Sequence, residues 1–137
     1  MKKEWSRKWV SSVQPRKQRK YAANAPLHAK RKMASASLAP ELRKRFGRRS
    51  MVIRKGDEVR ILRGDMKGKT GTVEKVDIRK GRVHVEGLKR KKVDGSEIPL
   101  PILPSKLQIT KLVLEDKRRQ AVLERSGRPG KKEKSGD

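Results

Sequence analysis

The sequence predicts a mainly β protein, in which one small antiparallel barrel or curled sheet follows a basic, partly helical extension and precedes a short helix. Only 32% of the 137 residues are hydrophobic, so the chain can build one modest core. From Met51 onward, short β-type runs are separated by glycines. Closely spaced strands without an intervening helix are typical of small antiparallel barrels.

The N-terminal extension, residues 1–50, contains 16 basic and 2 acidic side chains. It is poor in Val and Ile and has no strand-like alternation, so we expect it to be extended or partly helical and loosely ordered. Pro15 and Pro40 are suited to the first position of two short helices, and Gly47 is suited to end the second. These features predict a basic extension with two short helices and no strands.

Residues 51–114 are expected to form the folded domain. Val83 and Val85 alternate with Arg82 and His84, the period of a strand that is buried on one face. Strands are expected over residues 58–62, 70–77 and 82–88. The prolines at 99, 101 and 104 predict that the next segment is an extended edge rather than a central strand.

The C-terminal segment, residues 115–137, predicts one surface helix followed by a basic tail. Asp116 is a candidate N-cap, Val122 and Leu123 are expected to point inward, and Gly127 is suited to stop the helix.

The net charge of +25, from 40 Lys and Arg against 15 Asp and Glu, indicates a polyanionic partner. Nucleic acid fits better than membrane, because no apolar run approaches the roughly 18 residues of a spanning helix. The absence of Cys excludes disulfides and thiolate chemistry. We therefore expect a nucleic-acid-binding protein without a membrane segment.

The glycine-rich stretch between the first two expected strands, RGDMKGK, places Arg63, Lys67 and Lys69 in one loop. These three side chains are a candidate phosphate clamp. Gly71, at the start of the following strand, has two possible roles: a bulge that curls the sheet, or a site where a ribose-phosphate backbone approaches closely. The sequence leaves both open.

Aromatic residues are scarce, so the sheet lacks the stacking platform that readers of single strands need. Recognition should then rest on phosphates, 2′-hydroxyls and RNA shape. Tyr21 either stacks on a splayed base or packs against an apolar neighbour, and the partner of Trp5 and Trp9 cannot be deduced from the sequence. The basic turn from Lys89 to Lys92 is a further candidate for phosphate contacts.

The sequence contains no convincing catalytic constellation, and neither a metal site nor a cofactor is expected. His28 and His84 have no suitably spaced carboxylate or thiol. Asp57 and Glu58 are adjacent, which would put them on opposite faces of a strand. No phosphate-binding loop or dinucleotide fingerprint is present. We therefore expect no enzymatic activity.

The segment from Gly56 to Asp77 resembles a KOW motif, which is shared by ribosomal proteins and transcription elongation factors and marks an SH3-like barrel. The wider chain, residues 14–126, includes the basic run PRKQRKY and the later LPSKLQITKL. It resembles the archaeal and eukaryotic branch of the large-subunit ribosomal protein twenty-four family. Leu103 stands where the family often has His, which puts a His-specific RNA contact in doubt.

The resemblance implies a structural constituent of the large ribosomal subunit, located in the cytoplasmic ribosome. Its expected partners are the 5′ domain of the large rRNA and neighbouring proteins beside the polypeptide exit tunnel, with a role early in subunit assembly. No homo-oligomer is expected. The expected domains are the rRNA-binding extension 1–50, the KOW barrel 51–114, and the helix and tail 115–137. The expected RNA-binding residues are Arg16, Lys17, Arg19, Lys20, Tyr21, Lys30, Arg31, Lys32, Arg48, Arg49, Arg54, Lys55, Arg63, Lys67, Lys69, Lys80, Arg82, Lys89, Arg90, Lys91, Lys92 and Lys106.

Two other functions share some features of this sequence. A transcription elongation module also uses KOW domains, but it would need a preceding mixed α/β domain that the first 50 residues cannot make. A chromatin or DNA-bending protein would use the basic tails, but the sequence predicts a barrel rather than a helix that reads a DNA groove.

Overall fold

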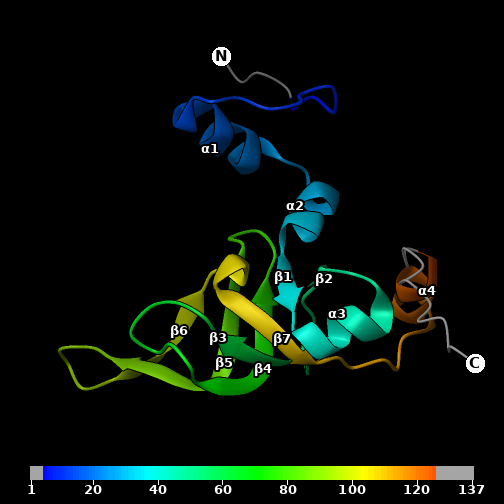
Figure 1. Ribbon diagram of the computed structural model, residues 1–137. Helices are drawn as coiled ribbons and strands as arrows, with labels where there is room; N and C mark the ends of the chain where they lie inside the picture. The colour runs from blue at the N-terminus through cyan, green and yellow to red at the C-terminus, as the bar shows by residue number, and fades with distance from the viewer. Residues whose placement is uncertain (1–4, 126–137) are drawn as a thin grey trace, which may run out of the picture.

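The computed structural model describes residues 5–125 (Figure 1). Seven strands form one sheet in the order β2-β1-β7-β3-β4-β5-β6. The strands are β1 (Ser35–Leu38), β2 (Ser50–Val52), β3 (Glu58–Ile61), β4 (Thr70–Asp77), β5 (Arg82–Lys91), β6 (Glu97–Ile102) and β7 (Leu107–Lys111). The helices are α1 (Pro15–Asn24), α2 (Leu27–Met33), α3 (Pro40–Phe46) and α4 (Lys117–Arg125), with the 3₁₀ turn η1 (Pro104–Lys106).

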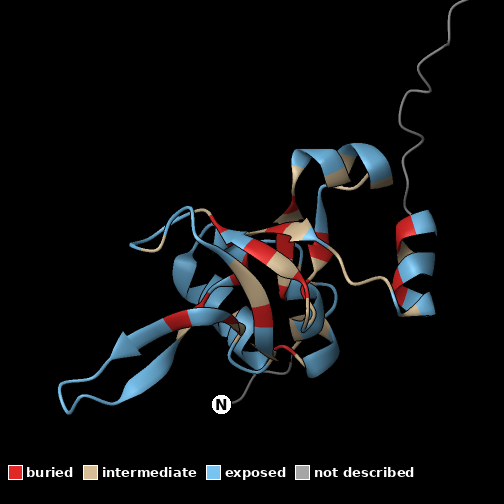
Figure 2. Ribbon diagram, turned by 90° about the horizontal axis from the view of Figure 1, so that it is seen from below, coloured by how far each residue is buried: buried red, intermediate tan, exposed pale blue. Residues whose placement is uncertain are grey.

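The three strands that the sequence predicts in the central domain are confirmed as β3, β4 and β5. They pair antiparallel, and their alternating valines point into the core. Val59 and Val83 are fully buried, and Val85 is 2% exposed. Buried segments, red in Figure 2, run through the strands of the sheet. His84, expected to face outward, is half-buried opposite Pro101 of β6.

The prediction of a small antiparallel barrel or curled sheet is confirmed only in part, because the sheet is open and mixed. Its two edges are β2 and β6, and β1 pairs parallel with β7. Pro99 and Pro101 lie in β6, where missing backbone N–H groups are tolerated at an edge. The expected edge strand is therefore confirmed for β6, whereas the following LQITK run forms β7 in the middle of the sheet.

The expectation that the first 50 residues form no strand is wrong. Strand β1 lies between β2 and β7, and it buries Ala36 and Leu38 in the core. Met51 of β2 is also buried there. Small residues make β1 inconspicuous in the sequence, since only two of its four side chains are apolar.

The two helices predicted from proline positions are confirmed. Helix α1 begins at Pro15 and α3 begins at Pro40, and Gly47 ends α3 with a φ of 64°, a left-handed conformation that glycine adopts without strain. The sequence did not predict α2. Helices α1 and α2 form an arm, residues 5–33 with the stretch before α1, that stands away from the sheet (Figure 1).

Helix α4 confirms the predicted C-terminal helix. The Asp116 carboxylate accepts a hydrogen bond from the backbone N–H of Arg118 at 2.8 Å, as an N-cap does. Leu123 is buried and Val122 packs against the core. The predicted stop at Gly127 and the basic tail lie outside the described residues.

Gly71 is required by a close approach within the protein itself. A Cβ at this position would lie 2.7 Å from Val85 Cγ1 and 3.0 Å from the Glu86 carbonyl oxygen. The irregularity between β4 and β5 lies further along, between Val73 and Lys75. The neighbour that approaches Gly71 is therefore strand β5.

Replacing Gly71 with alanine should lower the free energy of unfolding by about 1 to 3 kcal/mol, because the added methyl overpacks the contact with β5. Urea denaturation measures this loss. The matched control is Thr70→Ala on the exposed face of the same strand, which should stay within about 0.5 kcal/mol of the parent. Equal losses at the two positions would contradict the steric explanation.

Candidate nucleic-acid interface

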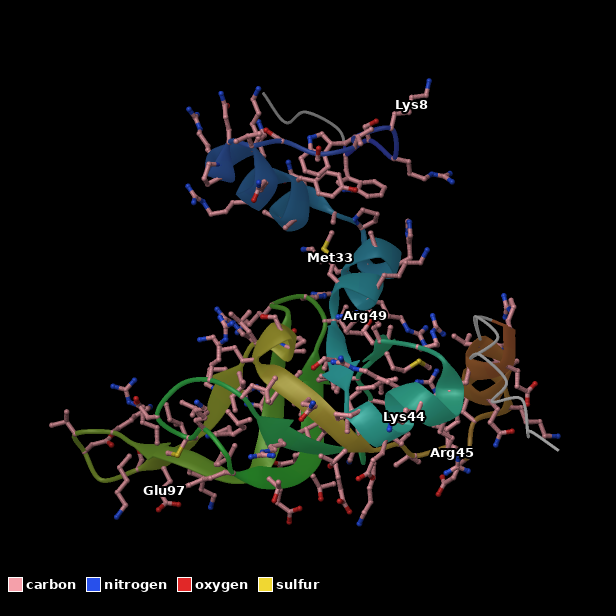
Figure 3. All side chains as sticks on the ribbon, in the orientation of Figure 1. Lys8, Met33, Lys44, Arg45, Arg49 and Glu97 are labelled. Atoms are coloured by element: carbon pink, nitrogen blue, oxygen red, sulfur yellow. The ribbon has the colours of Figure 1, made fainter. Side chains whose placement is uncertain are left out.

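The sheet and its loops form a groove with five basic side chains, which we call the hairpin groove. It lies where the β3–β4 loop and η1 meet the β5–β6 hairpin, and its volume is about 470 Å³. The β5–β6 hairpin projects from the sheet, and Glu97 lies on the projecting part (Figure 3). The basic residues that line the groove are Arg63, Arg82, Lys89, Arg90 and Lys106.

Backbone hydrogen bonds hold one wall of the hairpin groove in place. The Leu62 N–H donates to the Lys106 carbonyl at 2.9 Å, which ties the loop to η1. Within the loop, the Gly68 N–H donates to the Ile61 carbonyl at 2.8 Å and the Lys67 N–H donates to the Gly64 carbonyl at 3.1 Å. The cations of this wall thus project from a backbone that is ordered without a ligand.

Four of the five cations have no acidic partner. The side chains of Arg63, Arg82, Arg90 and Lys106 make no ion pair or hydrogen bond with any residue of the described range 5–125. Lys89 pairs with Glu97 at 3.2 Å, and both side chains are exposed. Like charges that converge on one groove repel one another, and a bound polyanion relieves that repulsion.

Two further grooves flank the arm where it joins the sheet. The arm groove, about 370 Å³, includes Lys30, Arg79 and Lys80. Met33 also lines it, beside α2 in Figure 3. The β4 groove, about 700 Å³, has the basic side chains Arg31, Arg54, Lys55 and Lys75. Cations from the arm and from the sheet therefore face the same spaces.

The aromatic residues of the arm pack together. The Tyr21 ring stacks on the Trp9 ring with centroids 4.2 Å apart, and the Trp5 ring lies 5.4 Å from Tyr21. His28 meets Trp5 edge-on at 6.1 Å. Thus the stretch before α1 folds back onto both helices, and the partners of the two tryptophans are Tyr21 and His28.

The other expected RNA-binding residues are spread over several surfaces. Helix α1 presents four exposed cations to solvent, and Arg49 follows α3 (Figure 3).

Two expected RNA-binding residues are engaged within the protein: Arg54 pairs with Asp116, and Arg48 donates to the Val122 carbonyl at 2.9 Å. The expected clamp is divided, because Arg63 lines the hairpin groove but Lys67 and Lys69 do not. The residues outside all three grooves and outside these contacts are Arg16, Lys17, Arg19, Lys20, Lys32, Arg49, Lys67 and Lys69, whereas Lys91 and Lys92 flank a shallow recess at the hairpin tip.

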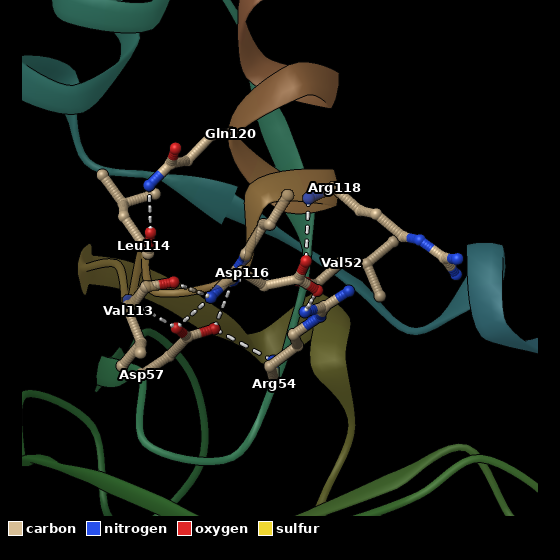
Figure 4. A network of polar contacts seen from close by, with 9 residues as sticks. Val52, Arg54, Asp57, Val113, Leu114, Asp116, Arg118 and Gln120 are labelled. Atoms are coloured by element: carbon tan, nitrogen blue, oxygen red, sulfur yellow. Dashed lines mark hydrogen bonds and ion pairs between the residues drawn. The ribbon is translucent and has the colours of Figure 1, made fainter.

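Sequence reasoning missed a buried ion pair that holds α4 to the sheet (Figure 4). The Arg119 guanidinium donates to both Asp57 carboxylate oxygens, at 2.7 and 2.6 Å, and also to the Val113 carbonyl at 2.8 Å. Both charged side chains are at most 1% exposed. One signal was available: Arg119 is four residues before Leu123, so the two share the inward face of the helix.

A second pair closes the same junction near the surface. The Arg54 guanidinium and the Arg118 backbone N–H hold the pKa of the Asp116 carboxyl below its usual value. This junction positions the β2–β3 loop, from which Arg54 and Lys55 reach the β4 groove. The two ion pairs of this junction therefore have a structural role.

Neither a metal-binding cluster nor a membrane-spanning helix is present in the part of the chain that the structure describes. Between residues 5 and 125 no group of His, Asp and Glu side chains is arranged to hold a metal ion. In the same range no helix has the length and apolarity to cross a membrane.

Two comparisons with known proteins found relatives of this chain. A family model that describes the eukaryotic ribosomal proteins L26 and their archaeal counterparts matches residues 12–126. The large ribosomal subunit protein uL24 of Korarchaeum cryptofilum (strain OPF8) is 50% identical over 118 residues, which are 86% of this chain and 90% of that protein.

Proposed function

The chain belongs to the family of the eukaryotic ribosomal proteins L26 and their archaeal counterparts, and from this premise we propose that it binds the 5′ domain of the large rRNA. It is a structural protein of the large subunit in the cytoplasmic ribosome, and it is not an enzyme. What remains to be explained is how this chain holds RNA.

The observation that supports RNA binding is the placement of cations around three grooves, most of them without an acidic partner among the described residues. Neutralisation of phosphates by such side chains releases counterions, and this release supplies much of the affinity for nucleic acid. The described aromatic residues of the arm pack against one another, so they offer little stacking surface. Contacts therefore fall mainly on phosphates and on RNA shape.

The arrangement of arm and sheet suits a protein that joins the subunit early and lies near the exit tunnel, as the family likeness implies. The hairpin groove faces the β5–β6 hairpin, whereas the two arm-flanking grooves lie beside α2 and the start of β1, although η1 and Leu103 border both the hairpin groove and the arm groove. One molecule can thus contact separate rRNA helices and hold them together before other proteins bind. Neighbouring large-subunit proteins are then its protein partners.

The alternative functions have no support from the fold. A transcription elongation module needs a mixed α/β domain ahead of the KOW segment, whereas residues 5–50 supply an arm, α3 and strands that join the same sheet. A DNA-bending protein needs an element that enters a groove of the duplex. The family match favours neither.

The test is binding of the full chain to separate transcripts of each domain of the large rRNA from the source organism. We expect the 5′ domain to bind at least about tenfold more tightly than the other domains in moderate salt, since a specific fold presents phosphates at matched positions. Transcripts of the other domains, trimmed to equal length, are the controls. Equal affinity for every domain would contradict the assignment of the 5′ domain.

A further inference from the structure

We propose that the hairpin groove receives one unstacked nucleotide of the bound RNA, with its base against apolar side chains and its phosphates between the cations. This inference rests on the proposed function and names the part of the RNA that this groove takes. A groove of about 470 Å³ has the size of a site for one small molecule and is too small for a duplex.

The groove has an apolar lining as well as a basic one. Ile61 and Ile102 are buried, Met66 and Leu100 are half-buried, and Leu103 keeps 36% of its surface exposed. These side chains come from β3, the following loop, β6 and the residue after β6. An exposed Leu among unpaired cations is not needed to bind phosphate alone, whereas a base has apolar faces that such a surface can cover.

The cations stand on different elements around this apolar lining. Arg63 comes from the β3–β4 loop and Lys106 from η1, while Arg82 and Arg90 come from the two ends of β5. A nucleotide within a chain has a phosphate on each side of its ribose, so cations on more than one side can bind both. The charges and the apolar lining thus complement one unstacked nucleotide.

The single acidic residue of the lining favours a nucleotide over an acidic peptide. Asp65 lies in the loop beside Arg63 and Met66. Its carboxylate repels any anion, phosphate included, but the base of a nucleotide brings an exocyclic amine from which it can accept a hydrogen bond, whereas the carboxylate side chains of an acidic peptide bring no donor. Adenine, cytosine and guanine have such an amine, and uracil does not.

The experiment compares two RNA hairpins that bind the full chain: one fully paired stem, and the same stem with a single bulged adenosine. The parent protein should bind the bulged RNA about fivefold more tightly, which is the low end of the range for a base on an aromatic side chain, because the groove offers aliphatic side chains instead. Leu103→Ser should remove this preference, because the substitution takes an apolar side chain from the groove and alters no charge.

One control variant and one further test variant check this interpretation. Val93→Ser, at an exposed apolar residue on the hairpin tip outside the groove, should keep the preference for the bulge. Met66→Ser removes an apolar side chain from the loop wall and should act as Leu103→Ser does. Thermal unfolding of each variant shows whether the sheet is intact.

The outcomes separate this inference from the proposed function. If both serine variants of the groove keep the bulge preference, the groove does not hold a base, although RNA binding stands. If the parent protein binds neither the hairpins nor the rRNA domains, the proposed function fails. Displacement of the bulged adenosine by stoichiometric poly-glutamate, without displacement of the paired stem, would identify an acidic peptide as the occupant and overturn the inference.

Discussion

Replacing Arg119 with methionine should lower the free energy of unfolding by about 3 to 5 kcal/mol, one of the largest single effects expected in this protein. The substitution removes the charged partner of Asp57, whose side chain is fully buried. The carboxylate would keep only the backbone N–H groups of Arg54 at 2.9 Å and Val113 at 3.1 Å. A buried charge left without its counter-charge costs more than the pair contributes when intact. Urea denaturation measures the loss.

Arg118→Met is the matched control, because Arg118 is the exposed neighbour on the same helix. Its loss should stay within about 0.5 kcal/mol. The double variant Arg119→Met with Asp57→Leu should recover much of the stability, since it removes both charges from the interior. If the two methionine variants are equally unstable, α4 depends on general helix stability and not on the buried pair.

The central strands could be predicted because their side chains alternate strictly and are bounded by glycines. In β3 and in the first four residues of β5 every second residue is a buried β-branched residue, so the local pattern and the tertiary environment agree there. Strand β1 could not be predicted in this way. It is short, its side chains are small, and its neighbour β7 lies about 70 residues away in the sequence, so its pairing depends on contacts that no local pattern records.

The charge of the candidate site could be predicted, but not which cations converge. Arg63 and Lys106 are far apart in the sequence and meet only because η1 is tied to the β3–β4 loop. Arg54 was expected to contact RNA and is also bound by Asp116, a partner 62 residues away. The apolar side of the hairpin groove was missed because Leu100 and Leu103 lie in a proline-rich edge segment, where the sequence shows no buried face.

The arm should carry most of the salt dependence of RNA binding. Residues 1–33 contain 11 Lys and Arg and one acidic residue. A chain that begins at Ala34 keeps β1 and β2 and therefore the whole sheet, and we propose that it folds as the independent unit in place of residues 51–114 alone. If about six arm cations contact phosphates, this deletion should reduce the slope of log affinity against log salt by about 4 to 5, since each lost contact removes roughly 0.7 to 0.9.

The comparison variant replaces Arg63, Lys67 and Lys69 with glutamine, which removes at most three contacts and should reduce the slope by no more than about 2 to 3. Discrimination between the 5′ domain and a scrambled RNA should fall more in this loop variant, because its cations project from an ordered backbone that fits one RNA geometry. Filter binding at several salt concentrations, with both RNAs, measures the two quantities together. The shortened chain must keep the parent's unfolding transition in urea, which shows that the sheet is intact. A slope that survives this deletion would mean that the grooves of the sheet alone bind the RNA phosphates, and that the 11 cations of residues 1–33 serve another partner.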